Sequence, residues 1–320
     1  MIRFGVLSTA SIIDRYIAGI RASKHGYVQA IASRTIEKAK EAAERLNIET
    51  YYGTYEELYK DENIDVIYIP TVNSFHYRDA KNALMHHKHV VVEKPFVLKP
   101  EEAKELFRIA KENNCFLMEA QKILFLPATL KVKDMLENNI IGNVSYIELK
   151  AGFPSRFDYD HWMYDLKMGG GSFYGSATYT IEYMQYLFND PKISINGSYL
   201  PSPTGSDEVS NFQLVMNNNI LVNSTITMNV PLINGAVFYG DKGHIFVDHF
   251  WKSRRVELFL NDGTHEVYPF PVEHEFVYEV DHINECILNN QLTSPVMTPE
   301  RTIETVELVD TLYKQWGLVE

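Results

Sequence analysis

The chain has 320 residues, of which 45% are hydrophobic and 22% are charged, a composition typical of folded proteins and long enough for two domains. Its net charge of -12 at pH 7 opposes non-specific attraction to nucleic acids and anionic lipids, and no run rich in Lys or Arg offsets it. We therefore expect a small molecule as partner, with no nucleic acid and no membrane.

The two cysteines, Cys115 and Cys286, fit neither a disulfide framework nor a metal-binding C-x-x-C pattern, and we expect buried thiols in a reducing compartment. The first residues, MIRFGVL, enter a strand-like run at once, so we expect no signal peptide. No apolar stretch approaches the roughly 20 residues that span a bilayer. These features predict a cytoplasmic protein.

From Ile2 to about Met118, short apolar runs alternate with helical patterns. This alternation predicts βαβ units with right-handed crossovers and a parallel, doubly wound sheet, here over residues 1–120. The expected strands are RFGVL, YVQAIAS, IDVIYIP, HVVVE and CFLM, and the expected helices lie near residues 11–21, 36–45, 74–87 and 100–113.

After a helical pattern near PATLKVKDMLENN, the rhythm changes to longer strand-like runs separated by turn signals such as Asn217–Asn219 and Asn261–Gly263. These runs indicate an antiparallel sheet. They are VSYIELKAGF, ISINGSYL, VSNFQLVM, ILVNSTITMN, HIFVDHF and RVELFL. Two further helices are expected near residues 274–288 and 299–316, so residues 121–320 form a second, α+β domain.

The loop after the first strand is the usual place for a glycine-rich dinucleotide fingerprint. Here the three glycine positions hold Ser8, Ala10 and Ile13, so the motif alone is a poor match. The small residues Ser8 to Ser11 still permit close approach of a pyrophosphate. A plain strand–helix turn with an N-cap is an equal alternative.

The end of the second strand carries Ser33 and Arg34, where an NAD site usually has an acid that binds the ribose 2′-hydroxyl. An arginine can instead bind a 2′-phosphate through charge-assisted hydrogen bonds, and Lys38 adds a second cation one helical turn on. This pattern favours NADP over NAD, although NAD is possible. The alternative is a solvated pair of cations at an exposed helix start.

The stretch VVVEKPF, Val90 to Phe96, runs from a buried strand straight into a charged pair. Because open α/β sheets bind ligands at the carboxyl ends of their strands, Glu93 and Lys94 are candidates for chemistry. The alternative is a surface ion pair.

Several motifs together resemble the glucose-fructose oxidoreductase, inositol dehydrogenase and rhizopine-catabolism (Gfo/Idh/MocA) family of nicotinamide-dependent dehydrogenases. Their order and spacing along nearly the whole chain carry the resemblance. They are the N-terminal βαβ pattern, PTVNSFH at 70–76, EKP at 93–95, GGG at 169–171, YGDKG at 239–243 and SPVMTPE at 294–300. The family fold is a Rossmann domain followed by a domain with a large, mostly antiparallel sheet that often forms an oligomer interface.

In that family the lysine of EKP lies beside the nicotinamide and the reacting carbon, which gives Lys94 a catalytic role. The family's usual motif G-G-G-A-L-x-D-x-G-x-H reads GGGSFYGSATY here, with Gly175 at the aspartate and Tyr179 at the histidine. A tyrosine there is similar to the branch of dimeric dihydrodiol dehydrogenases and xylose dehydrogenases, in which it acts as acid/base. Tyr179 could also be a packing residue.

The resemblance and the strand-end positions together predict the sites. The cofactor-binding candidates are Ser8, Thr9, Ala10, Ser11, Ile12, Ser33, Arg34, Lys38, Thr71, Asn73, His76, Glu93, Lys94 and Trp162. The substrate-binding candidates are Lys122, Arg156, Asp160, His161 and Tyr164. No metal is expected, because His86, His87 and His89 lie at a helix end where neighbouring side chains diverge.

The resulting hypothesis is an oxidoreductase that transfers a hydride between a nicotinamide cofactor, preferably NADP, and a sugar, polyol or related diol or ketone. A homodimer or homotetramer through the C-terminal sheet is expected from the resemblance. The alternative is a non-catalytic dinucleotide-binding sensor or regulatory protein on the same fold.

Overall fold

A computed structural model of the protein describes residues 1–189 and 192–320. The chain divides into two compact units, the first comprising residues 1–122 and 273–303 and the second residues 123–272 and 304–320. The sequence predicts a division at residue 120 with everything after it in the second domain. The structure groups residues 273–303 with the first unit because helix α8 (Val277–Leu288) packs against α1 (Ile13–Ala22).

The first unit contains a six-stranded parallel sheet in the order β3-β2-β1-β4-β5-β6. Every residue of β4 is buried and so are the three valines of β5, as expected for central strands covered on both faces. The predicted doubly wound parallel sheet is confirmed. Its strands are β1 (Ile2–Leu7), β2 (Gly26–Ala32), β3 (Thr50–Tyr52), β4 (Val66–Ile69), β5 (His89–Glu93) and β6 (Leu117–Ala120).

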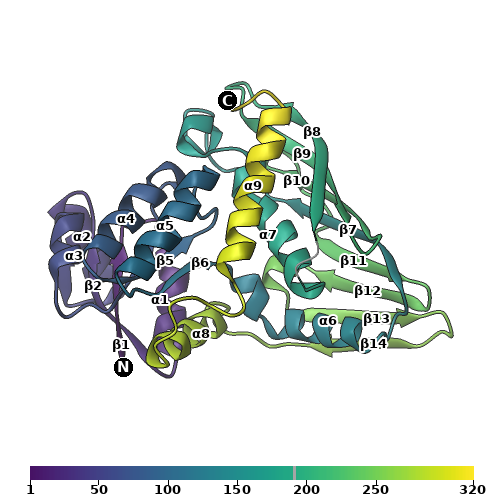
Figure 1. The fold of residues 1–320 in the computed structure, drawn as a ribbon, viewed down its shortest axis with the longest axis horizontal. Coiled ribbons are helices and arrows are strands. Elements are labelled where there is room, and N and C mark those ends of the chain that lie inside the picture. Colours follow the sequence, from purple (N-terminus) through teal and green to yellow (C-terminus); the bar gives the residue numbers. More distant parts are fainter. Residues whose placement is uncertain (190–191) are drawn as a thin grey trace. The chain divides into compact units, whose positions relative to one another are not determined.

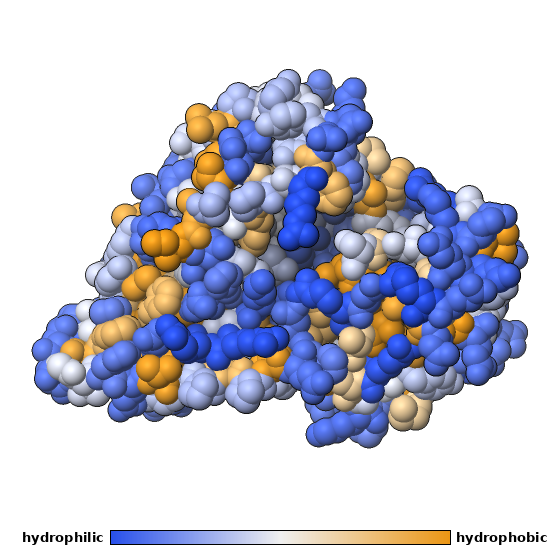
Figure 2. All heavy atoms as spheres, turned by 180° about the vertical axis from the view of Figure 1, so that it is seen from behind, coloured by the Kyte–Doolittle hydropathy of each residue, from blue (hydrophilic) through white to orange (hydrophobic). Residues whose placement is uncertain are grey.

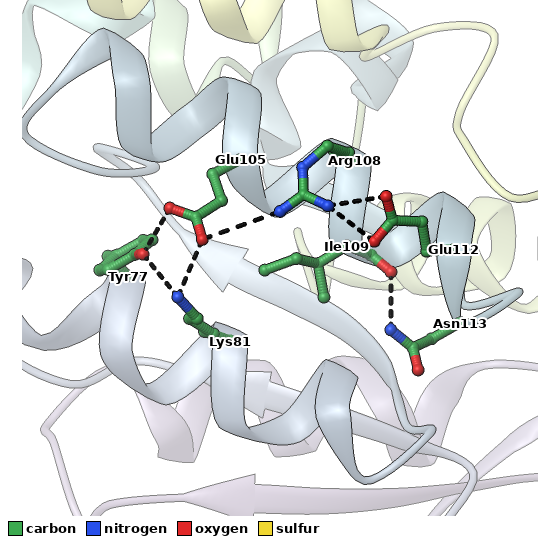
Figure 3. A network of polar contacts seen from close by, with 7 residues as sticks. All are labelled: Tyr77, Lys81, Glu105, Arg108, Ile109, Glu112 and Asn113. Atoms are coloured by element: carbon green, nitrogen blue, oxygen red, sulfur yellow. Dashed lines mark hydrogen bonds and ion pairs between the residues drawn. The ribbon is translucent and has the colours of Figure 1, made fainter.

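The helices of this unit include two that lie side by side, α4 and α5 (Figure 1). Figure 3 shows Tyr77 and Lys81 of α4 pointing toward Glu105 of α5, with Lys81 Nζ 2.8 Å from Glu105 Oε1. Such partly exposed contacts contribute little to stability and mainly align the two helices. Besides α1 and α8, the helices are α2 (Ile36–Leu46), α3 (Tyr55–Lys60), the 3₁₀ turn η1 (Asn73–Phe75), α4 (His76–Met85) and α5 (Pro100–Glu112).

The second unit contains an eight-stranded sheet in the order β14-β13-β12-β11-β7-β10-β9-β8. All neighbouring strands are antiparallel except β7 and β10, which pair in parallel. A parallel pair requires a long crossover connection, and the chain between β7 and β10 supplies one. The strands are β7 (Val144–Gly152), β8 (Ile193–Pro201), β9 (Asp207–Met216), β10 (Leu221–Thr227), β11 (Gly235–Gly240), β12 (Gly243–Asp248), β13 (Arg255–Leu260) and β14 (His265–Pro269).

One face of this sheet is buried under helices. Helix α7 packs on β9 and β10, where Phe173 meets Phe212 edge to face with ring centroids 5.0 Å apart, and α6 packs on β13. The helical elements are η2 (Lys122–Phe125), α6 (Pro127–Glu137), η3 (Trp162–Tyr164), η4 (Leu166–Met168), α7 (Ser172–Leu187), η5 (Phe250–Lys252) and α9 (Pro299–Gln315), of which residues 304–315 belong to this unit.

Hydrophilic residues dominate the face of the molecule in Figure 2, with hydrophobic residues in small groups between them. Both cysteines are buried free thiols, as expected. Among the described residues, no helix combines the length and hydrophobicity needed to cross a lipid bilayer.

Candidate active site

The loop after β1 lacks glycine, but Ser8 in it has the positive φ that glycine usually supplies. Ser8 adopts a left-handed conformation with φ of 83°, which a side chain rarely tolerates and which glycine usually supplies. Its hydroxyl donates to the carbonyl of Pro70 at 3.2 Å and accepts from the amide of Ala10 at 3.3 Å. The turn that leads into α1 is therefore held by side-chain hydrogen bonds.

The end of β2 presents two unpaired cations at the start of α2. Arg34 and Lys38 are both exposed, and no carboxylate of the described residues forms an ion pair with either. Ser33 beside them is buried, and Thr35 caps the helix by accepting from the amide of Lys38. An anion could bind here without displacing an existing ion pair.

His76 connects the loops that follow β4 and β5. It is completely buried, with Nδ1 2.9 Å from the carbonyl oxygen of Pro95 and Nε2 2.9 Å from that of Thr71. Burial lowers the pKa of His76, so the ring is neutral and donates to only one carbonyl at a time. These two contacts suit a structural role in which His76 holds the two loops together. Of the neighbouring candidates, Thr71 is partly exposed and Asn73 is buried.

The strand-end pair Glu93 and Lys94 is partly exposed, in contrast to the buried valines before it. Glu93 accepts a 2.6 Å hydrogen bond from the Tyr68 hydroxyl through Oε1, and through Oε2 it accepts a 3.2 Å bond from the amide of Lys94. Farther on, the amide of Phe96 donates to Glu119 at 3.1 Å. Side-chain carboxylates thus bind the backbone amides on both sides of Pro95, from the partly exposed Glu93 before it and the buried Glu119 after it.

Lys122 follows β6 and is almost fully buried. Its Nζ lies 3.2 Å from Glu275 Oε1 and 4.7 Å from the centroid of the Phe276 ring. Burial lowers the pKa of Lys122 to about 7, with Arg15 and Lys94 as further causes of the same sign. Arg15 also forms an ion pair with Glu275. A lysine with this pKa exchanges protons readily near neutral pH.

Helix α7 of the second unit begins at an anchor built around Asp207. This buried carboxylate accepts from the Ser172 hydroxyl at 2.7 Å, from the Phe173 amide at 2.6 Å and from the Tyr313 hydroxyl at 2.8 Å. Gly171, with φ of 121°, leaves room for it, because a Cβ there would lie 2.2 Å from Asp207 Oδ1. The last glycine of GGG is therefore required by the close approach of Asp207.

Tyr179 lies on the one face of α7 that is not packed into the unit. Residues 175, 176, 179 and 186 are partly exposed, whereas the side chains between them are mostly buried. A Cβ at Gly175 would meet nothing within 4 Å. The helix therefore has space for the aspartate that the family pattern places there, and Tyr179 lies one turn farther along the same face.

The loop from residue 153 to 164 carries the remaining candidates. Arg156 and Asp160 are exposed, and His161 stacks on Phe157 with ring centroids 3.8 Å apart. Trp162 is partly exposed, but Tyr164 is buried within the unit. Of the predicted substrate residues, Arg156, Asp160 and His161 are therefore accessible, and Lys122 and Tyr164 are nearly buried.

The chain matches two sequence models of one family. Residues 2–121 match that of an oxidoreductase family with an NAD-binding Rossmann fold, and residues 129–246 match the GFO/IDH/MocA C-terminal domain. The chain belongs to the GFO/IDH/MocA family. Together with the observed fold, this membership makes it an NAD(P)-dependent oxidoreductase and confirms the resemblance seen in the sequence.

Curated relatives match over nearly the whole chain. A trans-1,2-dihydrobenzene-1,2-diol dehydrogenase of Danio rerio is 28% identical over 99% of this chain and 98% of its own length. The scyllo-inositol 2-dehydrogenase (NADP(+)) IolU of Bacillus subtilis is 28% identical over 100% of this chain and 98% of its own length. The GFO/IDH/MocA branch with dihydrodiol dehydrogenases is thus well represented among its relatives.

Solved structures agree on the fold. The 3-ketoreductase KijD10 from Actinomadura kijaniata, in complex with NADP and TDP-benzene, superposes with a TM-score of 0.89 at 25% identity, over 98% of this chain and 97% of that chain. A levoglucosan dehydrogenase at 16% identity has a TM-score of 0.88, over 99% of this chain and 97% of that chain, which shows the GFO/IDH/MocA architecture alone.

Sequence reasoning missed two residues whose hydrogen bonds hold the elements that carry the candidate residues. Tyr68 was part of an expected strand. Nothing in the sequence predicts the hydrogen bond from its hydroxyl to Glu93, apart from the presence of one polar group in an apolar run. Asp207 follows Gly205 and Ser206 in a turn-like stretch. The acids Asp207 and Glu208 directly before the VSNFQLVM strand were the available signal, but the sequence does not show which of them is buried as a cap.

Two histidines of the cluster near residue 86 are held by hydrogen bonds to the backbone. His86 Nδ1 lies 2.8 Å from the carbonyl of Asn82, and His89 Nδ1 accepts from the amide of Phe116 at 2.9 Å. Within the described part of the chain, no group of three or more His, Cys, Asp or Glu side chains is arranged to hold a metal.

Proposed function

We propose that the protein is an NADP-preferring dehydrogenase or reductase that interconverts a secondary alcohol and a ketone on a cyclic diol, a polyol or a sugar. The observation that carries the proposal is the pair of partly exposed side chains, Lys94 at a strand end and Tyr179 on the open face of α7, in a chain of this family. The activities named for the relatives support the choice of substrate class.

In this proposal Lys94 and Tyr179 divide the chemistry on one carbon–oxygen bond. The Lys94 ammonium stabilises negative charge that develops on the substrate oxygen, an electrostatic effect often among the largest in catalysis. Tyr179 exchanges the hydroxyl proton, typically worth ~10² to 10⁴ in rate. When bound, the nicotinamide supplies the hydride chemistry. Because position 175 is glycine, Tyr179 acts without the neighbouring aspartate of the usual motif.

The residues of the first unit fit a dinucleotide. The left-handed Ser8 and the small residues Thr9, Ala10 and Ser11 would let a pyrophosphate approach the start of α1, with Ile12 at its N-cap. Arg34 and Lys38 would bind a 2′-phosphate, with Ser33 beside them, and the absence of an acid there supports NADP over NAD. Toward the nicotinamide would lie Thr71, Asn73, His76, Glu93 and Lys94 of the first unit, together with Trp162 of the second. His76 would act by holding the loops of Thr71 and Pro95.

Arg156, Asp160 and His161 would contact hydroxyl groups of the substrate from the loop that follows β7. Lys122 and Tyr164 would reach the substrate only if it enters far enough to meet nearly buried groups. An exposed ring pair, His161 on Phe157, suits the flat face of a cyclic diol.

The decisive experiment is an assay of NADPH oxidation and NADP reduction with a panel of cyclic diols, inositols, aldoses and ketones, repeated with NADH and NAD. We expect turnover with at least one cyclic diol or polyol and a higher kcat/KM with the phosphorylated dinucleotide. If the protein bound NADPH but turned over no member of the panel, it would be the dinucleotide sensor instead.

We also propose that the protein forms a homodimer or homotetramer through the outer face of its eight-stranded sheet. Five rings on directly paired residues cross this face from β7 to β14, with centroids between 4.2 and 5.9 Å apart. They are Tyr146, Tyr239, His244, Phe259 and His265. Such a continuous row of aromatic rings suits a self-complementary contact. Light scattering should give a multiple of 36.9 kDa, and a monomer at micromolar concentration would reject the proposal.

A cytoplasmic location is part of the same proposal. Two buried free thiols without a disulfide are what a reducing compartment permits. Cell fractionation would test it, and recovery in a secreted fraction would contradict it.

A further inference from the structure

Tyr68 is a fully buried tyrosine of β4 whose hydroxyl reaches the edge of the candidate site. Its ring stacks on that of Tyr16 from α1, with centroids 3.5 Å apart and planes inclined by 3°. The hydroxyl donates to Glu93 Oε1 at 2.6 Å. A rigid core residue thus holds one oxygen of a partly exposed carboxylate.

The other oxygen of Glu93 is used as well. Oε2 accepts from the amide of Lys94 at 3.2 Å, so the carboxylate bridges the core and the backbone of the lysine. Glu93 on its own could sample several rotamers at the strand end, because it is partly exposed. The Tyr68 bond selects one of them.

A second acid, on helix α8, interacts electrostatically with Glu93. Glu279 of α8 is completely buried, and neither of its oxygens meets ordinary hydrogen-bond geometry with a donor of the described residues. Burial first, and the charge of Glu93 second, raise the pKa of Glu279 well above its usual range, although Lys122 partly offsets this. Burial thus favours the neutral form of Glu279, so this acid adds little repulsion to the Glu93 carboxylate that the Tyr68 hydroxyl binds.

We propose that Tyr68 is a positioning residue for the reaction: it holds the Glu93 carboxylate in one orientation, and that carboxylate holds the backbone of Lys94 at the end of β5. The inference rests on the proposed role of Lys94. Tyr68 itself touches neither substrate nor cofactor. Its contribution is to fix the end of β5 before any ligand binds. Lys94 is then held in one orientation, and catalysis does not have to order it.

The chain offers a matched pair of variants for the test. Tyr68→Phe removes the hydroxyl that bonds Glu93. Tyr16→Phe removes the hydroxyl of the ring stacked on it, which is buried and has no hydrogen-bond partner among the described residues. Both variants keep the aromatic stack, so a loss of packing affects them alike.

We expect Tyr68→Phe to lower kcat by about 10- to 100-fold, the range for a hydrogen bond to a charged group, while KM and the Kd of NADPH change less than about threefold. Tyr16→Phe should leave all three constants within about twofold. In a crystal structure of ligand-free Tyr68→Phe, the Glu93 side chain should occupy more than one rotamer. The melting temperatures of both variants should stay within about 4 °C of the parent, as expected below ~1 kcal/mol.

Equal kcat values for Tyr68→Phe and Tyr16→Phe would overturn the inference, as would a single, unchanged Glu93 rotamer. If Tyr68→Phe folds poorly, Glu93→Gln tests the same link from its exposed side, and the kcat loss should again exceed the change in KM. Lys94→Ala is measured in parallel. Full turnover in Lys94→Ala would defeat the proposed function itself, whereas loss there with normal Tyr68→Phe kinetics defeats only the positioning role.

Discussion

Arg34 is the residue that most directly sets the choice of cofactor in this account. It is exposed, and no carboxylate of the described residues pairs with it, so its guanidinium is available for a 2′-phosphate. We expect Arg34→Ala to raise the Kd of NADPH by about 10- to 100-fold, because charge-assisted hydrogen bonds are lost, and to leave the Kd of NADH within about twofold.

Fluorescence titration with both dinucleotides measures this, and Arg45→Ala at the other end of α2 is the control, since Arg45 already pairs with Asp14. A parallel loss of affinity for NADPH and NADH would contradict the role given to Arg34.

Single residues also show where sequence reasoning reached its limit. The fingerprint loop looked poor because Ser8 replaces a glycine, yet Ser8 adopts the left-handed conformation that glycine would have. Its two hydrogen bonds, to Pro70 and from Ala10, offset the cost of that conformation. Because Pro70 lies 62 residues away, this compensation cannot be inferred from the loop itself.

At the scale of elements, the start of helix α7 is capped by Asp207, a carboxylate from strand β9. Burial raises the pKa of Asp207 to about 6, although Ser172, Tyr313 and the Phe173 amide all donate to it. The native state therefore binds a proton at Asp207 more tightly than the unfolded chain, whose aspartates titrate near 4. Stability from this group is complete below about pH 4 and is lost as the pH rises to about 6.

We expect Asp207→Asn to remove this pH dependence. Compared with the variant, the parent should lose on the order of 3 kcal/mol of unfolding free energy between pH 4 and pH 7, from about two units of pKa shift. Denaturant unfolding at several pH values gives the difference, and groups shared by both proteins cancel. If the unfolding free energies of the parent and of Asp207→Asn changed equally between pH 4 and pH 7, the pKa of Asp207 would not differ between the folded and unfolded states, and the account would be contradicted.

The elements with strong periodicity were predicted well and the weak ones were missed. Most long helices begin and end within a few residues of their expected bounds, as α5 does at Pro100–Glu112. The 16-residue helix α7 was missed, because it is buried on most sides and shows no clear polar face. Strand β14 was missed because its residues are nearly all exposed, so no alternation marks it, and β3 because it has only three residues. The short α3 was missed although Thr54 and Glu57 form a capping box before it.

At the scale of the whole molecule, the family pattern predicted more than the residue patterns could. The long-range pairing of β7 with β10 and the return of residues 273–303 to the first unit depend on tertiary packing, which leaves no local mark in the sequence. The grouping of the candidate site residues likewise leaves no local mark in the sequence. Lys94 belongs to the first unit and Tyr179 to the second, and only the family pattern links them.

The central claim is that these two side chains act on the same carbon–oxygen bond, and a double-mutant cycle on kcat tests it most directly. Once a substrate is known, Lys94→Met, Tyr179→Phe and the double variant should be compared with the parent at saturating NADPH. We predict that each single variant loses at least about 10²-fold and that the double variant lies within about tenfold of the slower single one, because groups that act as a unit are not additive. Losses that multiply, or a single variant with the parent's kcat, would contradict the account.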